Sequence, residues 1–174
     1  HPTPTATFTA TTPCVQTCGA SVNDSLTVLQ FLSSTGTNIA GTTSGTLGLS
    51  ATVFSGYIAI SSASTHSFAI FSDDGSTLKI GGTTILTADG IHGLSGGSTS
   101  VTFQSAGLYA FYGEYFENAG GTGFTVQMDG TNISTSLLYA ASAPEPATMG
   151  VLAVGLLGLR AARRRGLTAR SEEH

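Results

Sequence analysis

Charged residues are scarce in this chain, and positive ones are almost absent from its first 143 residues. Asp, Glu, Lys and Arg make up 9% of the 174 residues. Residues 1–143 carry seven acids and one base, Lys79, for a net charge of −6, whereas residues 144–174 carry five Arg and three Glu. Nucleic acid requires a basic face on its protein partner. The acidic body therefore argues against nucleic acid and is compatible with a divalent cation.

Cysteine is also rare. The only two, Cys14 and Cys18, lie in the stretch PCVQTC, and two thiols are too few for a structural zinc site, which needs four nitrogen or sulfur ligands. If the protein is exported, a local disulfide between them is one interpretation. A redox role is the alternative.

Signatures of catalysis are missing too. No nucleophile elbow accompanies the isolated His66 and His92. Glycosidases place their two carboxylates on separate elements, whereas Asp73 and Asp74 are adjacent. The Gly-rich stretch GIHGLSGG at 90–97 lacks the lysine of a phosphate-binding loop. We therefore expect a protein that is not an enzyme.

Glycine, serine and threonine separate many short apolar segments, a pattern typical of strands and turns. Alternation with a period of two places Phe68 with Ile70, and Leu78 with Ile80, on one face of a strand. The segment 37–51 is rich in Gly, Ser and Thr and is expected to be a loop. The pattern predicts an all-β, antiparallel β-sandwich, with strands at 25–32, 52–61, 67–72, 76–80, 83–86, 98–104, 107–117 and 123–129.

Three regions follow from this pattern. Residues 1–22 begin with the Thr/Pro-rich HPTPTATFTATTP, which is expected to be a flexible arm. Residues 23–140 are expected to form the sandwich. Residues 141–174 are a separate C-terminal signal.

The C-terminal signal has three parts in order: Pro144-Glu145-Pro146, an apolar run at 147–159, and the arginines Arg160, Arg163, Arg164 and Arg165. The run predicts a short hydrophobic helix, below the roughly 20 residues of a full membrane span. Snorkelling of Arg160 lengthens it slightly. A buried C-terminal helix is the alternative, but three glycines and the clustered arginines disfavour it.

This tail closely resembles the PEP-CTERM sorting signal of Gram-negative bacteria. The resemblance implies export across the inner membrane, with transient anchoring there and the arginines left in the cytoplasm. It further implies recognition of Pro144, Glu145 and Pro146 by an exosortase-type enzyme, which removes the tail. Such proteins are associated with the cell surface or extracellular matrix, with biofilm and with exopolysaccharide.

The body resembles the PA-fourteen family of β-sandwich domains, named after anthrax protective antigen and also found in adhesins. The resemblance is carried by FSGYIAI (54–60), SFAIFSDDGSTLKIGGTTIL (67–86), DGIHG (89–93) and SAGLYAFYGEYFENAGGTGFTVQM (105–128). Many members have a tryptophan in the last strand, where this chain has Gln127 and Met128.

The family resemblance also implies a binding site. In adhesin-type members an Asp-Asp pair joined by a cis peptide holds calcium, and sugar hydroxyls complete the coordination. Here the pair is Asp73 and Asp74, with Asn118 and Gly121 of the loop ENAGGTG expected to add oxygens. The alternative is that Asp74-Gly75 is simply a hairpin turn with no ion.

We therefore expect calcium-dependent binding of a glycan or exopolysaccharide, for adhesion at the cell surface or in a biofilm matrix. The rival is a structural matrix or filament subunit that binds no sugar. Such a subunit would form a homo-oligomer through its sandwich edges.

Overall fold

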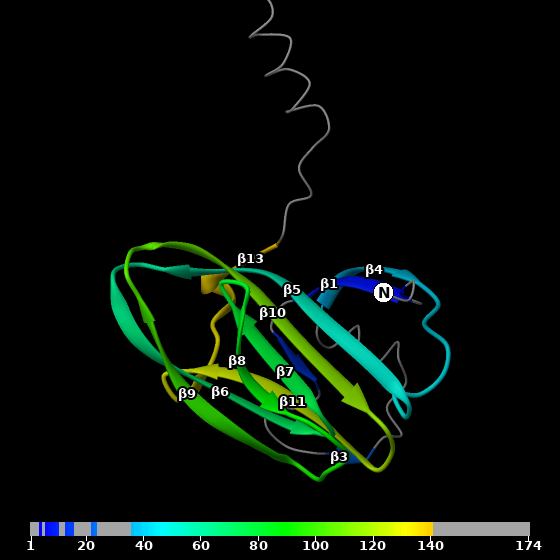
Figure 1. Ribbon diagram of the computed structural model, residues 1–174. Helices are drawn as coiled ribbons and strands as arrows, with labels where there is room; N and C mark the ends of the chain where they lie inside the picture. Colours follow the sequence, from blue (N-terminus) through cyan, green and yellow to red (C-terminus); the bar gives the residue numbers. More distant parts are fainter. Residues whose placement is uncertain (1–3, 5, 11–12, 16–21, 24–35, 141–174) are drawn as a thin grey trace, which may run out of the picture. The chain divides into compact units, whose positions relative to one another are not determined.

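The computed structural model describes residues 4, 6–10, 13–15, 22–23 and 36–140, all within the first of two compact units, His1–Ala141. Its strands form two main antiparallel sheets (Figure 1). The first has the order β13-β5-β10-β7-β8. Its strands are β5 (Ser50–Ile60), β7 (Ser76–Ile80), β8 (Thr83–Ala88), β10 (Gly107–Glu117) and β13 (Leu138–Ala140).

The second sheet has the order β12-β11-β6-β9. It contains β6 (Ser64–Asp73), β9 (Ser95–Phe103), β11 (Gly121–Met128) and β12 (Thr131–Asn132). A 3-10 helix, η1 (Thr135–Leu137), leads into β13. Within the described part of the chain, no helix has the length and apolar character that a membrane crossing requires. The expected all-β, antiparallel architecture is thus present, and the predicted C-terminal helix lies outside the described residues.

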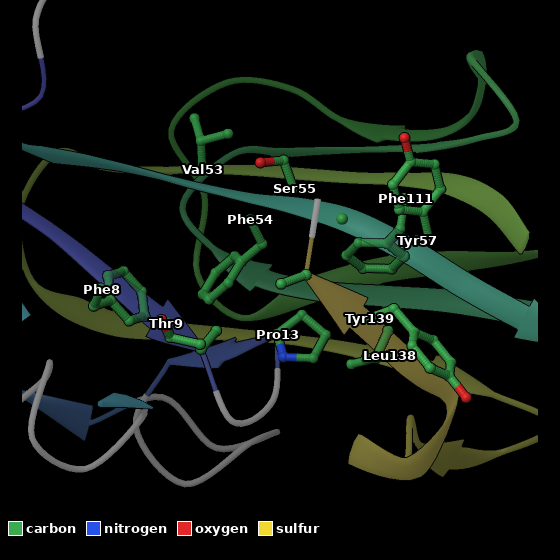
Figure 2. A pocket seen from close by; sticks show the side chains of 13 residues that line it. Phe8, Thr9, Pro13, Val53, Phe54, Ser55, Tyr57, Phe111, Leu138 and Tyr139 are labelled. Carbon is green, nitrogen blue, oxygen red and sulfur yellow. The ribbon is translucent and has the colours of Figure 1, made fainter. Parts of the chain in front are cut away.

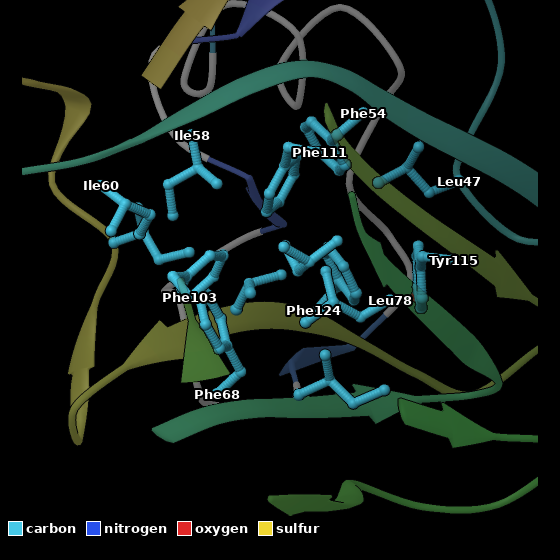
Figure 3. Packing of buried hydrophobic residues seen from close by; sticks show 14 residues of the cluster. Leu47, Phe54, Ile58, Ile60, Phe68, Leu78, Phe103, Phe111, Tyr115 and Phe124 are labelled. Carbon is cyan, nitrogen blue, oxygen red and sulfur yellow. The ribbon is translucent and has the colours of Figure 1, made fainter. Parts of the chain in front are cut away.

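Alternating side chains of the two sheets meet to form the core. Phe124 lies at its centre, with its ring stacked on Phe54 at 5.7 Å and on Tyr115 at 5.5 Å between centroids (Figure 3). The predicted inward pairs Phe68 with Ile70 and Leu78 with Ile80 are all buried. The period-two alternation in the sequence therefore identifies the core faces correctly.

The N-terminal region differs from the expected flexible arm. Strand β1 (Ala6–Ala10) pairs with β4 (Gly36–Gly41), while β2 (Cys14–Val15) and β3 (Val22–Asn23) pair with β11. The Phe8 ring packs edge-on against Phe54 at 5.9 Å, which gives β1 an apolar anchor on the sandwich. Strand β4 likewise lies in the segment 37–51 that was expected to be a loop. The predicted strand at 25–32 is outside the described residues.

The segment Asp73–Gly75 is not the tip of a hairpin, which corrects one expectation. Strands β6 and β7 flank it but belong to different sheets, since β6 pairs with β9 and β11, and β7 pairs with β8 and β10. Asp-Gly favours a tight turn whether or not the flanking strands pair with each other. The segment therefore carries the chain from one layer of the sandwich to the other.

Candidate functional site

Asp73 and Asp74 lie at one end of the sandwich, where β6 ends and the chain crosses to β7. The peptide bond between them is cis, as the family resemblance implied. Asp73 is 7% exposed and Asp74 is 2% exposed. The starts of β5 and β11 and the end of β10 lie at the same end of the molecule (Figure 1). The pair is therefore a buried acidic group at a rim formed by several loops, and not a solvated turn.

The Asp74 carboxylate joins two loops that are distant in sequence. Its Oδ1 accepts a hydrogen bond from the backbone N–H of His92 at 2.8 Å, and its Oδ2 accepts one from the backbone N–H of Asn118 at 2.8 Å. Such bonds to a carboxylate are charge-assisted and strong. Asp74 thus fixes the loop before β9 and the loop after β10 against the crossing segment.

Asp73 is held from the interior by its backbone. The Tyr115 hydroxyl lies 2.7 Å from the Asp73 carbonyl oxygen and 2.6 Å from Oε2 of the buried Glu117. Burial, and then the hydrogen bond with Glu117, raise the pKa of Tyr115 well above its usual range. The phenol therefore remains neutral, and its single hydrogen is shared between two acceptors, the Asp73 carbonyl and the Glu117 carboxylate. The contact with Asp73 connects β10 of one sheet to β6 of the other.

Polar groups form a layer beneath the crossing segment. The Ser72 and Ser76 hydroxyls are hydrogen-bonded to each other at 2.8 Å across it. Ser50 pairs with Glu117 in the ladder between β5 and β10. The side-chain hydroxyl of Thr122, which is fully buried, has no hydrogen-bond partner among the described residues. Buried hydroxyls in this position are suited to ordered water or to a further oxygen ligand.

The charge at this end of the sandwich favours a cation. Asp73, Asp74 and Glu117 are all buried here. Lys79, the only lysine of the chain, lies instead over the Tyr112 ring, with its Nζ 5.0 Å from the ring centroid. Oxygen donors of this kind suit a hard cation such as calcium. No three acidic, histidine or cysteine side chains among the described residues group as a ready metal site. A cation at this place would therefore also need oxygens from the backbone or from a ligand.

The other two expected ligands, Asn118 and Gly121, lie near the aspartate pair, but the structure shows only backbone contacts for them. Asn118 contacts Asp74 through its backbone N–H. Gly121 is the first residue of β11 and pairs with Asn23. Two residues further along β11, Gly123 pairs with Asp73. Asp89, which is not among the expected ligands, is exposed and accepts a hydrogen bond from the N–H of Gly90.

Sequence reasoning missed His92, Tyr115 and Glu117 as parts of this site. His92 contributes through its backbone, which no residue-type pattern reveals. Tyr115 and Glu117 are two residues apart on one strand, so their side chains share a face. This was the one signal in the sequence that could have placed them together. Of the remaining candidates, Cys14 is buried and disulfide-bonded. Those outside the described residues are Cys18, Pro144, Glu145, Pro146, Arg160, Arg163, Arg164 and Arg165.

A second polar cluster lies away from this site, at the turn from β11 to β12. His66 Nδ1 is 2.7 Å from Asp129 Oδ2, and His66 Nε2 is 2.9 Å from the Ser64 hydroxyl. Asp129 Oδ1 also accepts a hydrogen bond from the backbone N–H of Ser67. The hydrogen bond from His66, and then the one from Ser67, lower the pKa of Asp129. His66 is thus not isolated in the fold, and it connects β6 to this turn.

The fold is shared with known domains. The PA14 domain of the MpAFP antifreeze protein superposes with a TM-score of 0.65 at 21% identity, covering 81% of this chain and 78% of that one. The PA14 sugar-binding domain from an RTX adhesin gives a TM-score of 0.62 at 16% identity, covering 79% and 80%. No curated protein matches the chain. The described body is therefore a β-sandwich of the PA14 (PA-fourteen) type.

The tail adds a second assignment. Residues 142–165 match the PEP-CTERM protein-sorting motif. The protein is thus a PA14-type domain followed by a PEP-CTERM sorting signal, which marks it for export in a Gram-negative bacterium through a membrane-anchored intermediate.

Proposed function

We propose that the protein is a calcium-dependent glycan-binding module that acts in adhesion at the cell surface or in a biofilm matrix. The observation that carries the proposal is the buried pair Asp73–Asp74 at the rim of the sandwich. Both carboxylates lie on the segment that crosses between the sheets, beside the loop that begins at Asn118. A neighbour in fold is named as a sugar-binding domain from an adhesin, which favours sugar binding here.

Within this proposal the two aspartates have different roles. Each Asp74 oxygen already accepts one backbone hydrogen bond and keeps one acceptor site. Asp74 therefore also holds the loops in place, and the carboxylates of Asp73 and Asp74 together supply the charge for the ion. Oxygens of Asn118 and Gly121 add to the coordination. Calcium when bound would supply a positive centre for vicinal sugar hydroxyls.

Export and processing complete the proposal. An exosortase-type enzyme recognises Pro144, Glu145 and Pro146 and removes the hydrophobic tail, so that the inner membrane holds the chain only transiently. The mature protein then meets exopolysaccharide outside the cell, and catalysis has no part in this role.

The test is the effect of calcium on the melting temperature of the full chain in mild detergent. A ligand that binds only the folded state stabilises it by about 2.7 kcal/mol at about 100 times its Kd. We expect millimolar calcium to raise the melting temperature after chelator treatment, and Asp73→Asn to abolish most of that rise. Asp89→Asn is the matched control and should keep it. An equal rise in wild type and Asp73→Asn would rule out the site.

A structural role in assembly has one observation in its favour. Strand β5 pairs with β10 along its whole length, but β13 covers its other edge only at residues 56–58. Among the described strands, none pairs with residues 50–55 on that edge. A cavity of about 450 Å³ opens there, between β1, β5 and β13, and its lining includes Phe8, Pro13 and Tyr139 (Figure 2).

An open strand edge is a template for pairing with another chain. If the protein assembles in this way, sedimentation will show oligomers whose formation needs no calcium. The substitution Val53→Lys on that edge will dissociate these oligomers into monomers. A monomer at all concentrations would eliminate this alternative.

A further inference from the structure

The two outer faces of the sandwich differ in chemistry. Seven large hydrophobic residues of the described chain are exposed, and three of these lie in loops. The outer face of the second sheet carries small polar residues, such as Ser67 and Ser100, which pair with each other. The remaining four exposed hydrophobic residues are all on strands of the first sheet: Val53, Tyr57, Leu108 and Tyr139.

Strand register places three of these four side chains together. Tyr57 of β5 pairs with Tyr139 of β13 on one side and with Ala110 of β10 on the other (Figure 1). Two residues further along β5, Ala59 pairs with Leu108. Directly paired residues share a face of a sheet, as do residues two apart along a strand. We call this group the tyrosine face: Tyr57, Ala59, Leu108, Ala110 and Tyr139.

The tyrosine face carries no charge, although the body of the chain is acidic. The charged side chains on the same outer side of the sheet are Lys79 and Glu114, and both contact Tyr112. The Lys79 Nζ lies 5.0 Å from the centroid of the Tyr112 ring, and the Tyr112 hydroxyl donates to Glu114 Oε2 at 3.0 Å. Glu117, the other charged residue on the strands of this sheet, is buried at the rim. The tyrosine face is therefore a neutral surface that an anionic partner would not repel.

The chain continues from this face into the sorting signal. Tyr139 lies in β13, the last strand of the described residues, and the apolar run of the signal starts at residue 147. Eight residues span at most about 28 Å even when fully extended. The export intermediate is anchored in the membrane through this run. A tether of this length gives an effective concentration of about millimolar, so a face of modest affinity can bind.

We propose that the tyrosine face docks on the lipid surface of the inner membrane while the chain is anchored there. Tyrosine rings favour the level of the lipid headgroups, and Leu108 and the alanines contact the boundary of the acyl chains. Because the face has only five residues, docking depends on the tether and ends when the tail is removed. It needs no calcium, and it leaves free the rim at the other end of β10.

A tryptophan probe reports this docking directly, because the chain contains no tryptophan of its own. The full chain is reconstituted at one copy per nanodisc in phosphatidylethanolamine and phosphatidylglycerol, with a brominated phospholipid as quencher. We expect the fluorescence of Tyr57→Trp to be quenched by the brominated lipid and protected from acrylamide. Ser100→Trp, on the outer face of the second sheet, is the matched control. Its fluorescence should be accessible to acrylamide and unaffected by the brominated lipid.

Substitutions of opposite charge at Leu108 test whether the partner is lipid. One charge near an anionic membrane changes binding by about fivefold. In the Tyr57→Trp chain, Leu108→Asp should therefore lower the ratio of docked to free chain at least about fivefold on these anionic discs. Leu108→Lys should keep docking there and lose it on neutral phosphatidylcholine. Leu108 is 57% exposed, so both variants leave the core intact. Equal losses for the two variants on anionic discs would overturn the proposal.

Other occupants of the tyrosine face would give different results. Protection of Tyr57→Trp only when two chains share a disc would assign the face to a second copy of the chain. Exposure on lipid discs, with protection by an added neutral polysaccharide, would assign it to a glycan. Either result would overturn docking on lipid, as would equal quenching of Tyr57→Trp and Ser100→Trp by the brominated lipid.

Discussion

The Tyr115 hydroxyl and the Asp73 carbonyl oxygen are 2.7 Å apart, and this contact joins the two sheets from within the core. Tyr115 is 1% exposed, and its ring stacks on Phe124. The ring belongs to the apolar core, whereas its oxygen contacts the backbone of the candidate site. Tyr115 therefore makes the position of Asp73 depend on the packing of the sandwich.

Replacement of this hydroxyl tests that dependence. Tyr115→Phe keeps the ring and its stacking but removes the hydroxyl that contacts both the Asp73 carbonyl and the buried Glu117 carboxylate, and loss of a buried hydrogen bond costs about 1–3 kcal/mol. We expect the free energy of unfolding in urea to fall by that amount. Tyr57→Phe, on an exposed tyrosine, is the control and should change little. Equal stability of Tyr115→Phe and wild type would contradict the role assigned to the hydroxyl.

Asp74 should stabilise the fold even without a cation. Both of its oxygens accept backbone N–H groups, and the asparagine of Asp74→Asn offers only one oxygen, so that its NH₂ group faces a donor. We expect a loss of about 1–3 kcal/mol in unfolding free energy in the presence of chelator. Hydrogen exchange should quicken at the amides of His92 and Asn118. Unchanged protection of both amides would show that the loops are fixed by something else.

Gly75 should not tolerate a side chain. A Cβ atom there would lie 2.3 Å from Cε1 and 2.8 Å from Cζ of the Phe116 ring, and 3.1 Å from the carbonyl oxygen of Gly90. Overpacking of this kind costs about 1–3 kcal/mol. We expect Gly75→Ala to lower the unfolding free energy by that amount. Gly93→Ala is the control, because no atom of the described chain lies within 4 Å of the place that its methyl group would take.

The source of the Gly75→Ala penalty can be isolated with a second substitution. Phe116→Ala removes the ring that the new methyl group meets. The double variant should therefore lose less stability than the sum of the two single variants. Additive losses would assign the strain to the backbone and not to the ring.

Stability should depend on pH through Asp129. Its pKa is lowered in the folded protein from an ordinary value of 3.8, chiefly by the hydrogen bond with His66. A carboxyl with a depressed folded pKa stabilises the fold above its unfolded pKa, and this contribution is lost as the pH falls through the folded pKa. Asp129→Asn should therefore be less stable than wild type at pH 7, with the difference shrinking below about pH 4.

Urea unfolding of both proteins across this pH range provides the measurement. Asparagine tolerates the left-handed backbone that Asp129 adopts, with φ of 53°, so the substitution changes charge more than conformation. Asp89→Asn serves as a control for loss of a surface acid. A stability difference that is the same at every pH would show that the charge of Asp129 plays no part.

Local sequence was sufficient for most of the strands. The predicted bounds 76–80 and 107–117 coincide with β7 and β10. Gly81 and Gly82 form the expected two-residue turn between β7 and β8, and both have positive φ. These elements have strong period-two patterns or specific turn residues, so neighbouring residues alone define them.

Long-range pairing could not be predicted in the same way. Strands β1 and β4 are short and rich in Thr and Gly, and they are stabilised by each other and by the contact of Phe8 with Phe54. A Thr/Pro-rich composition indicates a flexible chain when no partner is known. The change of sheet between β6 and β7 was also hidden, because an Asp-Gly turn looks the same in a hairpin and in a crossing.

The site shows the same division. Asp73 and Asp74 are recognisable from the sequence because two acids stand together in a chain that is poor in charge. The groups that hold them come from His92, Tyr115 and Asn118, which are 18 to 44 residues away. Two of the three act through the backbone N–H, so only the fold can identify them.

The crossing between β6 and β7 has a mechanical consequence. A force that separates the two sheets at this end must stretch the segment Asp73–Gly75, since that segment is covalently continuous with both layers. Extension of the segment would pull Asp74 away from the loops of His92 and Asn118. Resistance to tension at this rim and retention of the proposed cation would therefore depend on the same few bonds.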